Sequence, residues 1–370
     1  MATEKNFKKA AKEIMSLSTK PDDKTLLLLY SLYKQAIEGD VSGGLPISGG
    51  IPAIAKYRAW KKQKGKSTED AMSEYVDLVA VLLERSEKIS AIESWKGRTV
   101  LISGASRGLG RAMALRFAEE GANLVLLGRT LESDDGKGSL KQTAEEVESV
   151  GGKAAIAVCD VRNDTDVIAA VQTGVDSFGG IDAVICNAGA LFIAPFDETP
   201  LKRFDLVHEV NIRASFSLCQ AALPHLRKSD NGRILVICPP PSLDSKWYKG
   251  TIAYTISKFS MSMLVLGLSE ELSGDGIAVN GLWPATTIDT AAVRYNKALG
   301  GEEMVRRSRK PKIVGDAAFT IMSKSGELTG EFHTDESILR AEGVEDFDQY
   351  AVEPGTVSYT HLTLPTICSV

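Results

Sequence analysis

Apolar side chains recur at two different spacings along the chain, and the change between them divides it in two. Up to about residue 88, apolar and aromatic residues return every three or four positions in four segments, NFKKAAKEIMSL, KTLLLLYSLYKQAI, IPAIAKYRAWKK and EDAMSEYVDLVAVLLER. This spacing gathers the apolar residues on one face of a helix. Residues 1–88 are therefore predicted to form a small all-α bundle of four helices.

From Thr99 onward the apolar residues form unbroken runs instead. The runs are TVLIS, NLVLLG, KAAIAVCDV, IDAVICNAG, RILVIC and IAVNGLWP, and helical stretches separate them. Fully apolar strands that alternate with helices are typical of a parallel sheet covered on both faces. Residues 97–356 are predicted to form a doubly wound α/β domain, with residues 89–96 as a linker.

Composition narrows the class of protein further. A chain of 370 residues, 44% hydrophobic and 25% charged, has the length of two globular domains, and its net charge of −5 does not suggest a nucleic-acid binder. Five cysteines and four histidines show no metal-ligand spacing, so no metal site is predicted. The longest early apolar run, TLLLLYSLY, falls short of the roughly 20 residues that span a bilayer, so no transmembrane segment is predicted there.

The last residues, VSYTHLTLPTICSV, break the pattern of the rest of the chain. They lack a helical period and follow Pro354-Gly355 abruptly. The string resembles a translated adapter from sequencing-library preparation. Residues 357–370 are therefore predicted to be a non-native tail that cuts the chain short, with a disordered native tail as the alternative.

Lysines stand among aromatic residues in the predicted bundle. Tyr30 and Lys34 share a face of the second helix, and Lys56 and Trp60 share a face of the third. An aromatic stripe at this spacing is often simply core. The interleaved lysines favour a ligand instead, because adenine stacks on rings while phosphates need cations.

The stretches YSLYKQA, AKYRAW and AMSEYVD resemble the acyl-CoA-binding protein family across nearly all of residues 5–85. This resemblance implies a four-helix bundle that binds long-chain fatty acyl-CoA. The positions it implies for contacts with the CoA part are Tyr30, Lys34, Lys56 and Tyr75, the two lysines meeting phosphates. Tyr57 replaces the family's usual tryptophan and Met15 a common lysine, which puts the affinity in doubt more than the ligand class.

A glycine-rich turn follows the first predicted strand, in LISGASRGLGRAMALRF. Gly104, Gly108 and Gly110 let the backbone approach a pyrophosphate held at a helix N-terminus. The second strand ends at Gly128-Arg129-Thr130, where an acid would bind a ribose 2′-hydroxyl. Arg129 there, with Arg107 in the turn, favours NADP(H) over NAD(H), although either arginine could face solvent.

Further motifs in sequence order, CDV, NAG, VNIRAS, YTISK and a proline after IAVNGLW, resemble the short-chain dehydrogenase/reductase family over residues 97 to about 355. RILVICPPPSLDSKWYKGTIAYTISK and GLWPATTIDTAA resemble, within it, the hydroxysteroid dehydrogenase-like protein 2 group. The resemblance implies a Rossmann domain, with a water held by Asn211. The cofactor contacts predicted here are Gly104, Ser106, Arg107, Gly108, Leu109, Gly110, Arg129, Asp160, Asn187, Gly189, Lys258 and Pro284.

Tyr254 and Lys258 form the predicted catalytic pair. They stand one helical turn apart and can face the same cleft. An ammonium near the phenol favours phenolate, which lowers the tyrosine pKa from about 10 toward neutrality. Proton transfer to or from a substrate oxygen is efficient in that range.

The family's usual serine at the end of the preceding strand is missing. RILVI runs into Cys238 and three prolines, and Pro239 aligns with the usual serine position. The serine ordinarily hydrogen-bonds the substrate oxygen, and losing such a donor costs a few kcal/mol of transition-state stabilisation. Ser242 or Cys238 is hypothesised to substitute. The competing interpretation is a non-catalytic carrier or sensor of acyl-CoA and dinucleotide on a decayed dehydrogenase fold.

Taken together, these features predict an NADP(H)-dependent oxidoreductase that interconverts a hydroxyl and a carbonyl on a fatty acyl-CoA or related lipid. A steroid or retinoid substrate stays open, because a fold does not fix a substrate. Relatives of the second domain often carry a C-terminal lipid-carrier domain and a peroxisomal address. The resemblance therefore implies the peroxisome, with cytoplasm and mitochondrion as alternatives, and assembly into homo-oligomers.

Overall fold

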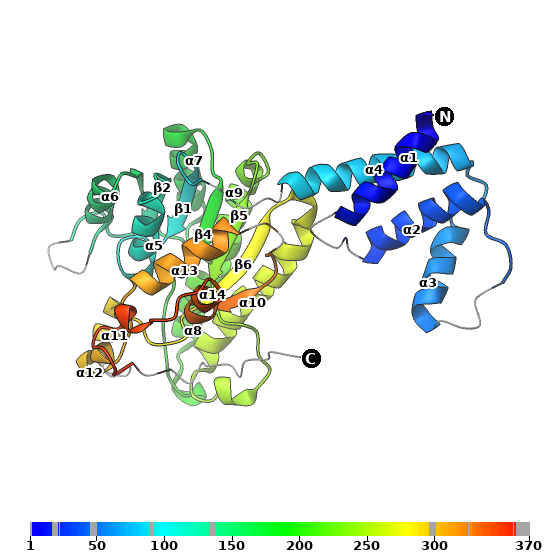
Figure 1. Cartoon of the computed structure of the whole chain (residues 1–370). Helices are drawn as coiled ribbons and strands as arrows, with labels where there is room; N and C mark the ends of the chain where they lie inside the picture. The colour runs from blue at the N-terminus through cyan, green and yellow to red at the C-terminus, as the bar shows by residue number, and fades with distance from the viewer. Residues whose placement is uncertain are drawn as a thin grey trace. The chain divides into compact units, whose positions relative to one another are not determined.

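The chain divides into two compact units, Met1–Ser90 and Ala91–Val370, in a computed structural model of the protein (Figure 1). The structure describes residues 2–16, 21, 23–44, 50–88, 92, 94–133, 138–295, 301–324, 326, 328–357 and 359. Each unit has a hydrophobic core of its own and is taken here by itself.

The first unit confirms the predicted four-helix bundle. Its helices are α1 (Ala2–Glu13), α2 (Asp23–Glu38), α3 (Gly50–Lys61) and α4 (Thr68–Lys88), with a short 3-10 turn η1 (Ile14–Ser16) after α1. The apolar stripes meet in a core that includes Phe7, Leu32, Tyr75 and Val79. Ser67 begins α4 by accepting a hydrogen bond from the amide of Asp70 at 3.0 Å.

The second unit is built on a parallel sheet of seven strands in the order β3-β2-β1-β4-β5-β6-β7. The six predicted strands are present, as β1 (Thr99–Ser103), β2 (Asn123–Gly128), β3 (Lys153–Val158), β4 (Ala183–Cys186), β5 (Arg233–Ile237) and β6 (Ala278–Trp283). The short β7 (Phe332–Thr334) was not predicted, because three partly polar residues carry no strand pattern.

Helices cover both faces of this sheet, which confirms the doubly wound α/β prediction (Figure 1). One face packs against α5 (Gly108–Ala118), α6 (Leu140–Ser149), α13 (Lys312–Ser323) and α14 (Asp335–Ala341). The other packs against α7 (Asp164–Phe178), α9 (Ala214–Leu226) and α10 (Ile252–Glu271). The remaining helices, α8 (Leu201–His208), α11 (Ala291–Arg294) and α12 (Gly301–Arg306), follow β4 and β6.

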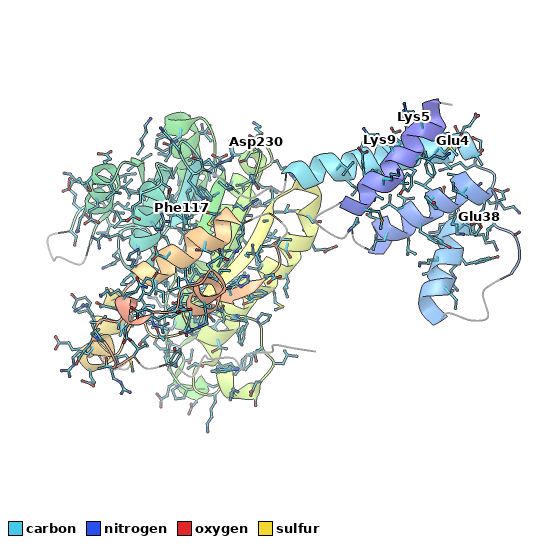
Figure 2. All side chains as sticks on the ribbon, viewed as in Figure 1. Glu4, Lys5, Lys9, Glu38, Phe117 and Asp230 are labelled. Atoms are coloured by element: carbon cyan, nitrogen blue, oxygen red, sulfur yellow. The ribbon has the colours of Figure 1, made fainter. Side chains whose placement is uncertain are left out.

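The end of the predicted linker belongs to the core of the second unit. Trp95 is 2% exposed and packs edge-on against Phe117, with ring centroids 4.7 Å apart. Its indole N–H donates a hydrogen bond of 2.8 Å to the hydroxyl of Ser323 at the end of α13. Figure 2 labels Phe117 at this position within the second unit. The structure thus places Trp95, which the sequence assigned to the linker 89–96, in the core of the second unit, and an isolated tryptophan gives no periodic signal that would indicate this.

The tail predicted to be non-native lies mostly outside the described residues. Of its residues, Val357 and Tyr359 are described. Tyr359 forms an isolated antiparallel bridge with Thr286, and its hydroxyl donates hydrogen bonds to the carboxylate of Glu336.

Among the described helices, α10 is the one whose length and apolar composition would allow it to cross a bilayer. A third of its most apolar window is buried, and it packs against β6 in the second unit. A core helix of this kind passes the same test, so the finding is weak support for a membrane span.

Candidate active site

A cleft of about 790 Å³ opens at the carboxyl ends of the strands in the second unit. Twelve residues predicted from the sequence line it, namely Gly104, Ser106, Arg107, Gly108, Leu109, Arg129, Asp160, Asn187, Gly189, Tyr254, Lys258 and Pro284. In open parallel α/β sheets, ligands bind in this crevice. Four further predicted residues, Gly110, Asn211, Cys238 and Ser242, are not part of the cleft lining.

The glycine turn after β1 has the geometry that a dinucleotide requires. Gly104 and Gly108 adopt φ of 69° and 57°, in the left-handed region that favours glycine. A Cβ added to Gly110 would lie 2.3 Å from the carbonyl oxygen of Gly104, so a side chain there would push α5 away from the turn. The residues present thus fit a pyrophosphate at the N-terminus of α5.

Asn187, at the end of β4, holds this turn in place. Its side-chain amide donates to the carbonyl oxygens of Ser103 and Gly104 at 2.9 and 3.2 Å. The hydroxyl of Ser103 in turn accepts the main-chain amide of Asn187 at 3.0 Å. Asn187 therefore lines the groove and also ties β1 to β4.

Three arginines, Arg107, Arg129 and Arg162, line the cleft. Arg162 binds the carboxylate of Asp160 through Nη2 at 2.5 Å and Nε at 3.0 Å. These hydrogen bonds lower the pKa of Asp160 to about 2, so its carboxylate is ionised. The sequence predicted Asp160 as a cofactor contact, and in the structure its carboxylate binds Arg162.

Tyr254 and Lys258 lie together in the cleft, on the first two turns of α10. The Lys258 ammonium donates 2.7 Å to the carbonyl oxygen of Ile237 and lies 5.5 Å from the ring centroid of Trp283. Burial lowers the pKa of Lys258 to about 8 and raises the pKa of Tyr254 above its usual value. Desolvation is the cause of the raised Tyr254 pKa, and it opposes the lowering that a neighbouring ammonium would produce.

Asn211 lies in a π-helical turn (Glu209–Arg213) between α8 and α9 and is fully buried. Its side-chain oxygen accepts the amide of Ala190 at 2.8 Å, and its Nδ2 donates to the hydroxyl of Ser257 at 2.8 Å. Asn211 thus connects the loop after β4 to α10 directly beside Lys258. The water that the resemblance assigned to it stays a prediction.

Neither hypothesised substitute for the serine reaches the cleft. Cys238 is fully buried in the core beneath α10, and burial raises the pKa of its thiol to about 12. The hydroxyl of Ser242 accepts the amide of Asp244 at 3.2 Å, and the Ser242 carbonyl accepts the Tyr248 hydroxyl at 2.8 Å. Cys238 faces the core and Ser242 is absent from the cleft lining, so their catalytic role stays a prediction that the geometry does not support.

Several residues of the cleft were missed by the sequence interpretation. Trp283 and the hydroxyl-bearing residues Thr286, Thr287 and Thr290 line it just after β6. Their signal was the threonine-rich stretch WPATTIDT, which was noted only as part of a resemblance.

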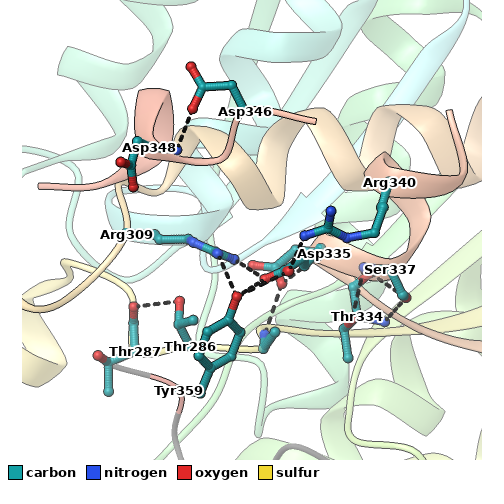
Figure 3. Close-up of polar contacts among 12 residues, drawn as sticks. Thr286, Thr287, Arg309, Thr334, Asp335, Ser337, Arg340, Asp346, Asp348 and Tyr359 are labelled. Carbon is teal, nitrogen blue, oxygen red and sulfur yellow. Dashed lines mark hydrogen bonds and ion pairs between the residues drawn. The ribbon is translucent and has the colours of Figure 1, made fainter. Parts of the chain in front are cut away.

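A buried acidic residue, Asp335, holds this threonine-rich loop in place (Figure 3). Asp335 has no exposed surface, and its Oδ1 accepts the amide of Ala285 at 2.8 Å. Arg309 is 3% exposed, forms an ion pair of 2.8 Å with Glu336, and donates its main-chain amide to the carbonyl of Thr287 at 3.0 Å. The loop that faces the cleft is thus fixed by residues 22 to 50 positions further along the chain.

In the first unit, three of the four predicted acyl-CoA contacts lie together between α2 and α3. The Lys56 ammonium lies 5.2 Å from the ring centroid of Tyr30, and the Lys34 ammonium 5.3 Å from that of Trp60. Lys34 also pairs with Glu38. Tyr75 is 4% exposed and packs edge-on against Phe7, so its ring belongs to the core.

Comparison with known protein families agrees with the resemblances noted for the two units. Residues 98–298 match the short chain dehydrogenase family, and residues 4–79 match the acyl CoA binding protein family. The chain therefore belongs to the short chain dehydrogenase family and carries an N-terminal acyl-CoA-binding domain.

Individual relatives refine this assignment. Hydroxysteroid dehydrogenase-like protein 2 of Pongo abelii is 46% identical over 260 residues, which cover 70% of this chain and 61% of that relative. A short chain dehydrogenase from Mycobacterium thermoresistibile is 40% identical with a TM-score of 0.68, covering 74% of this chain and 96% of that one. An NAD+-bound xylitol dehydrogenase, 24% identical with a TM-score of 0.57 and covering 65% of this chain and 98% of that one, shares the fold.

Proposed function

We propose that this protein is an NADP(H)-dependent oxidoreductase that interconverts a hydroxyl and a carbonyl on a fatty acyl-CoA or a related lipid. The observation that carries the proposal is the pairing of Tyr254 and Lys258 in one cleft with a glycine turn shaped for a dinucleotide. The acyl-CoA-binding domain on the same chain points to the substrate.

Tyr254 and Lys258 have separate roles in the proposed reaction. A reduced nicotinamide supplies the hydride to the carbonyl carbon. Tyr254 donates its phenolic proton to the carbonyl oxygen, which becomes the hydroxyl, and regains a proton from solvent. A charged Lys258 stabilises the phenolate that this transfer leaves behind. Its lowered pKa, about 8, keeps it mostly protonated at neutral pH.

The preference for the phosphorylated dinucleotide rests on charge. Arg107 and Arg129 line the cleft, and β2 ends without an acidic residue. A 2′-phosphate gains from two arginines, and it is not repelled by an acid at this strand end. Replacing Arg129 by Gln is expected to weaken NADPH binding about 10-fold and leave NADH binding unchanged. Arg227→Gln, an exposed arginine outside the cleft that pairs with Asp275, is the matched control.

A tethered carrier domain would raise the local concentration of acyl-CoA around the second unit. The experiment follows NADPH absorbance with 3-oxoacyl-CoA substrates of several chain lengths, beside a Tyr254→Phe control. Turnover that the control loses by at least 100-fold would support the proposal. Turnover that Tyr254→Phe retains would contradict the assigned proton donor.

A second candidate function is a non-catalytic carrier or sensor of acyl-CoA and dinucleotide. Pro239 at the usual serine position favours it, as do Cys238 and Ser242 turned away from the cleft. Calorimetry separates the two candidates. Binding of both NADPH and acyl-CoA without turnover of any acyl-CoA or free carbonyl compound tested would favour the carrier.

The peroxisome is the location we propose, on the resemblance to the hydroxysteroid dehydrogenase-like protein 2 group alone. Imaging of a full-length fusion beside a peroxisomal marker tests it. Assembly into a homo-oligomer, proposed on the same ground, is tested by sedimentation.

A further inference from the structure

The loop after β6 begins beside the acidic residue that holds it. β6 and β7 end side by side, because Trp283 pairs with Thr334 in their parallel ladder. Asp335 follows directly, and its Oδ1 accepts the amide of Ala285 at 2.8 Å. Asp335 has no exposed surface and Ala285 is 5% exposed. The hydrogen bond is thus made inside the protein, where such bonds are stronger than in water.

Asp335 is itself fixed by the first turn of α14 (Figure 3). The hydroxyl of Thr334 accepts the amide of Ser337 at 3.0 Å, and the hydroxyl of Ser337 accepts the amide of Thr334 at 2.9 Å. This reciprocal capping holds the start of the helix. The Oδ1 of Asp335 also accepts the amide of Glu336 at 2.8 Å. The carboxylate is therefore held in one orientation toward the loop.

The hydrogen bond from Ala285 lies between two residues of the cleft wall. Pro284 and Thr286 flank Ala285, and both line the cleft. The second half of the loop has a different support, since the main-chain amide of Arg309 donates to the carbonyl of Thr287 at 3.0 Å. Removing the carboxylate of Asp335 should therefore loosen the beginning of the loop and leave its second half in place.

The beginning of this loop lies at the catalytic end of the cleft. The ring centroid of Trp283, the last residue of β6, lies 5.5 Å from the Lys258 ammonium. Arg129 lines the cleft just after β2. β2 lies four strand positions away from β6 in the sheet, roughly 19 Å at about 4.8 Å per strand. Asp335 and the proposed 2′-phosphate contact therefore act at opposite ends of the cleft.

We propose that Asp335 is a positioning residue for the nicotinamide half of the cofactor and acts through the amide of Ala285. The inference rests on the proposed oxidoreductase function. With the loop fixed in advance, the cofactor does not have to order Pro284 and Thr286 when it binds. Loss of the hydrogen bond therefore weakens binding of the nicotinamide half and leaves binding of the adenosine half unchanged.

Asp335→Ala removes the acceptor, and calorimetry with two ligands tests its effect. We expect the Kd of NADPH to rise about 10-fold, because the amide of Ala285 loses a buried acceptor and the loop must be ordered on binding. The Kd of adenosine 2′,5′-bisphosphate, the adenosine half without the nicotinamide, should change less than about twofold. Asp335→Asn keeps an oxygen at this place and should restore the Kd of NADPH to within about threefold of the wild type.

Asp182→Ala is the matched control. The Oδ2 of Asp182 accepts the amide of Thr99 at 2.8 Å, just before β4 and at the start of β1, outside the cleft lining. This variant loses the same kind of hydrogen bond at the other end of the strands, so it reports the effect of lost stability by itself. Both of its Kd values should stay within about twofold of the wild type.

Three results would overturn the proposal. The first is an unchanged Kd of NADPH in Asp335→Ala, and the second is an equal weakening of NADPH and adenosine 2′,5′-bisphosphate. The third is an Asp335→Asn variant that binds NADPH as poorly as Asp335→Ala. If Asp335→Ala does not fold, Asp335→Ser takes its place, because its hydroxyl is one bond shorter than the carboxylate. It should show the same difference between the two ligands, and equal effects on both would again contradict the assignment.

Failure of the proposed function looks different. Both arms measure binding, so the role of Asp335 is tested even where the wild type reduces no carbonyl compound. A wild type that binds NADH in place of NADPH contradicts the proposed cofactor preference, and the same comparison is then made with NADH and ADP. A wild type that binds neither dinucleotide overturns both proposals.

Discussion

The side chains at the end of β5 show how strongly position decides the chemistry of a single residue. Cys238 and Ser242 carry groups that could hydrogen-bond a substrate, yet one is packed in the core and the other caps a turn. Lys258 is 7% exposed, and its ammonium donates to the Ile237 carbonyl and lies 5.5 Å from the Trp283 ring centroid. Whether a side chain at this strand end can take part in catalysis therefore depends more on its burial than on its residue type.

The double variant Cys238→Ala with Ser242→Ala is therefore expected to keep kcat within about threefold of the wild type. The reason is that neither side chain lines the cleft. The buried Cys238 change should cost about 1–2 kcal/mol of stability through the small cavity it leaves. Steady-state kinetics and denaturant unfolding check the two statements, and a 100-fold drop in kcat would restore one of these residues to the catalytic site.

Asp335 gives a prediction about pH and stability. Burial raises its pKa from 3.8 to about 6, so the folded state binds the proton more tightly than the unfolded state. Its contribution to stability is therefore full below about pH 4 and falls as pH rises through 6, by about 3 kcal/mol in total.

Replacing Asp335 by Asn removes this titration while keeping an oxygen that can accept the amide of Ala285. The difference in melting temperature, variant minus wild type, should be roughly 5–10 °C larger at pH 7 than at pH 4. Thermal unfolding of both proteins across this range measures it. A difference that stays constant with pH would show that Asp335 does not titrate in this window.

At the scale of elements, replacing two helical glycines by alanine is expected to have opposite effects on stability. Gly110 in α5 has no room for a Cβ, which would lie 2.3 Å from the Gly104 carbonyl and 2.7 Å from Asn187 Nδ2. Gly110→Ala should cost about 1–3 kcal/mol by overpacking and weaken dinucleotide binding at least 10-fold. Gly267 in α10 is exposed with nothing within 4 Å, so Gly267→Ala should stabilise the fold by about 0.5–1 kcal/mol.

Denaturant unfolding and NADPH titration of the two variants test this pair. If Gly110→Ala bound the dinucleotide like the wild type, the close approach of α5 to the glycine turn would have no functional role. Gly267→Ala also serves as the control for a glycine-to-alanine change in a helix.

Elements with local signals were predictable, and elements fixed by distant contacts were not. The six strands, the four N-terminal helices and the glycine turn are encoded by periodicity or by short motifs. Trp95 was misplaced because its partner Ser323 lies 228 residues away. The hydrogen bond from the Ala285 amide to Asp335, 50 residues further along the chain, could not be predicted for the same reason. Trp283 was overlooked because a tryptophan at a strand end is usually read as packing.

At the scale of the whole molecule, two hydrophobic cores predict two unfolding transitions. The first unit packs around Phe7 and Tyr75, and the second around the two faces of its sheet. A ligand that binds one folded unit stabilises that unit by RT ln(1 + [L]/Kd), about 2.7 kcal/mol at 100 times Kd. Acyl-CoA should therefore raise the transition of the first unit, and NADPH that of the second.

Differential scanning calorimetry of the full chain with each ligand alone and with both checks this expectation. Lys56→Ala is the matched variant, because Lys56 is exposed on α3 over the Tyr30 ring and lies outside the core of its unit. It should abolish most of the shift caused by acyl-CoA and leave the shift caused by NADPH intact. If acyl-CoA raised both transitions and Lys56→Ala removed both effects, the two units would be energetically coupled, and the carrier domain would act on the dehydrogenase as an effector as well as a source of substrate.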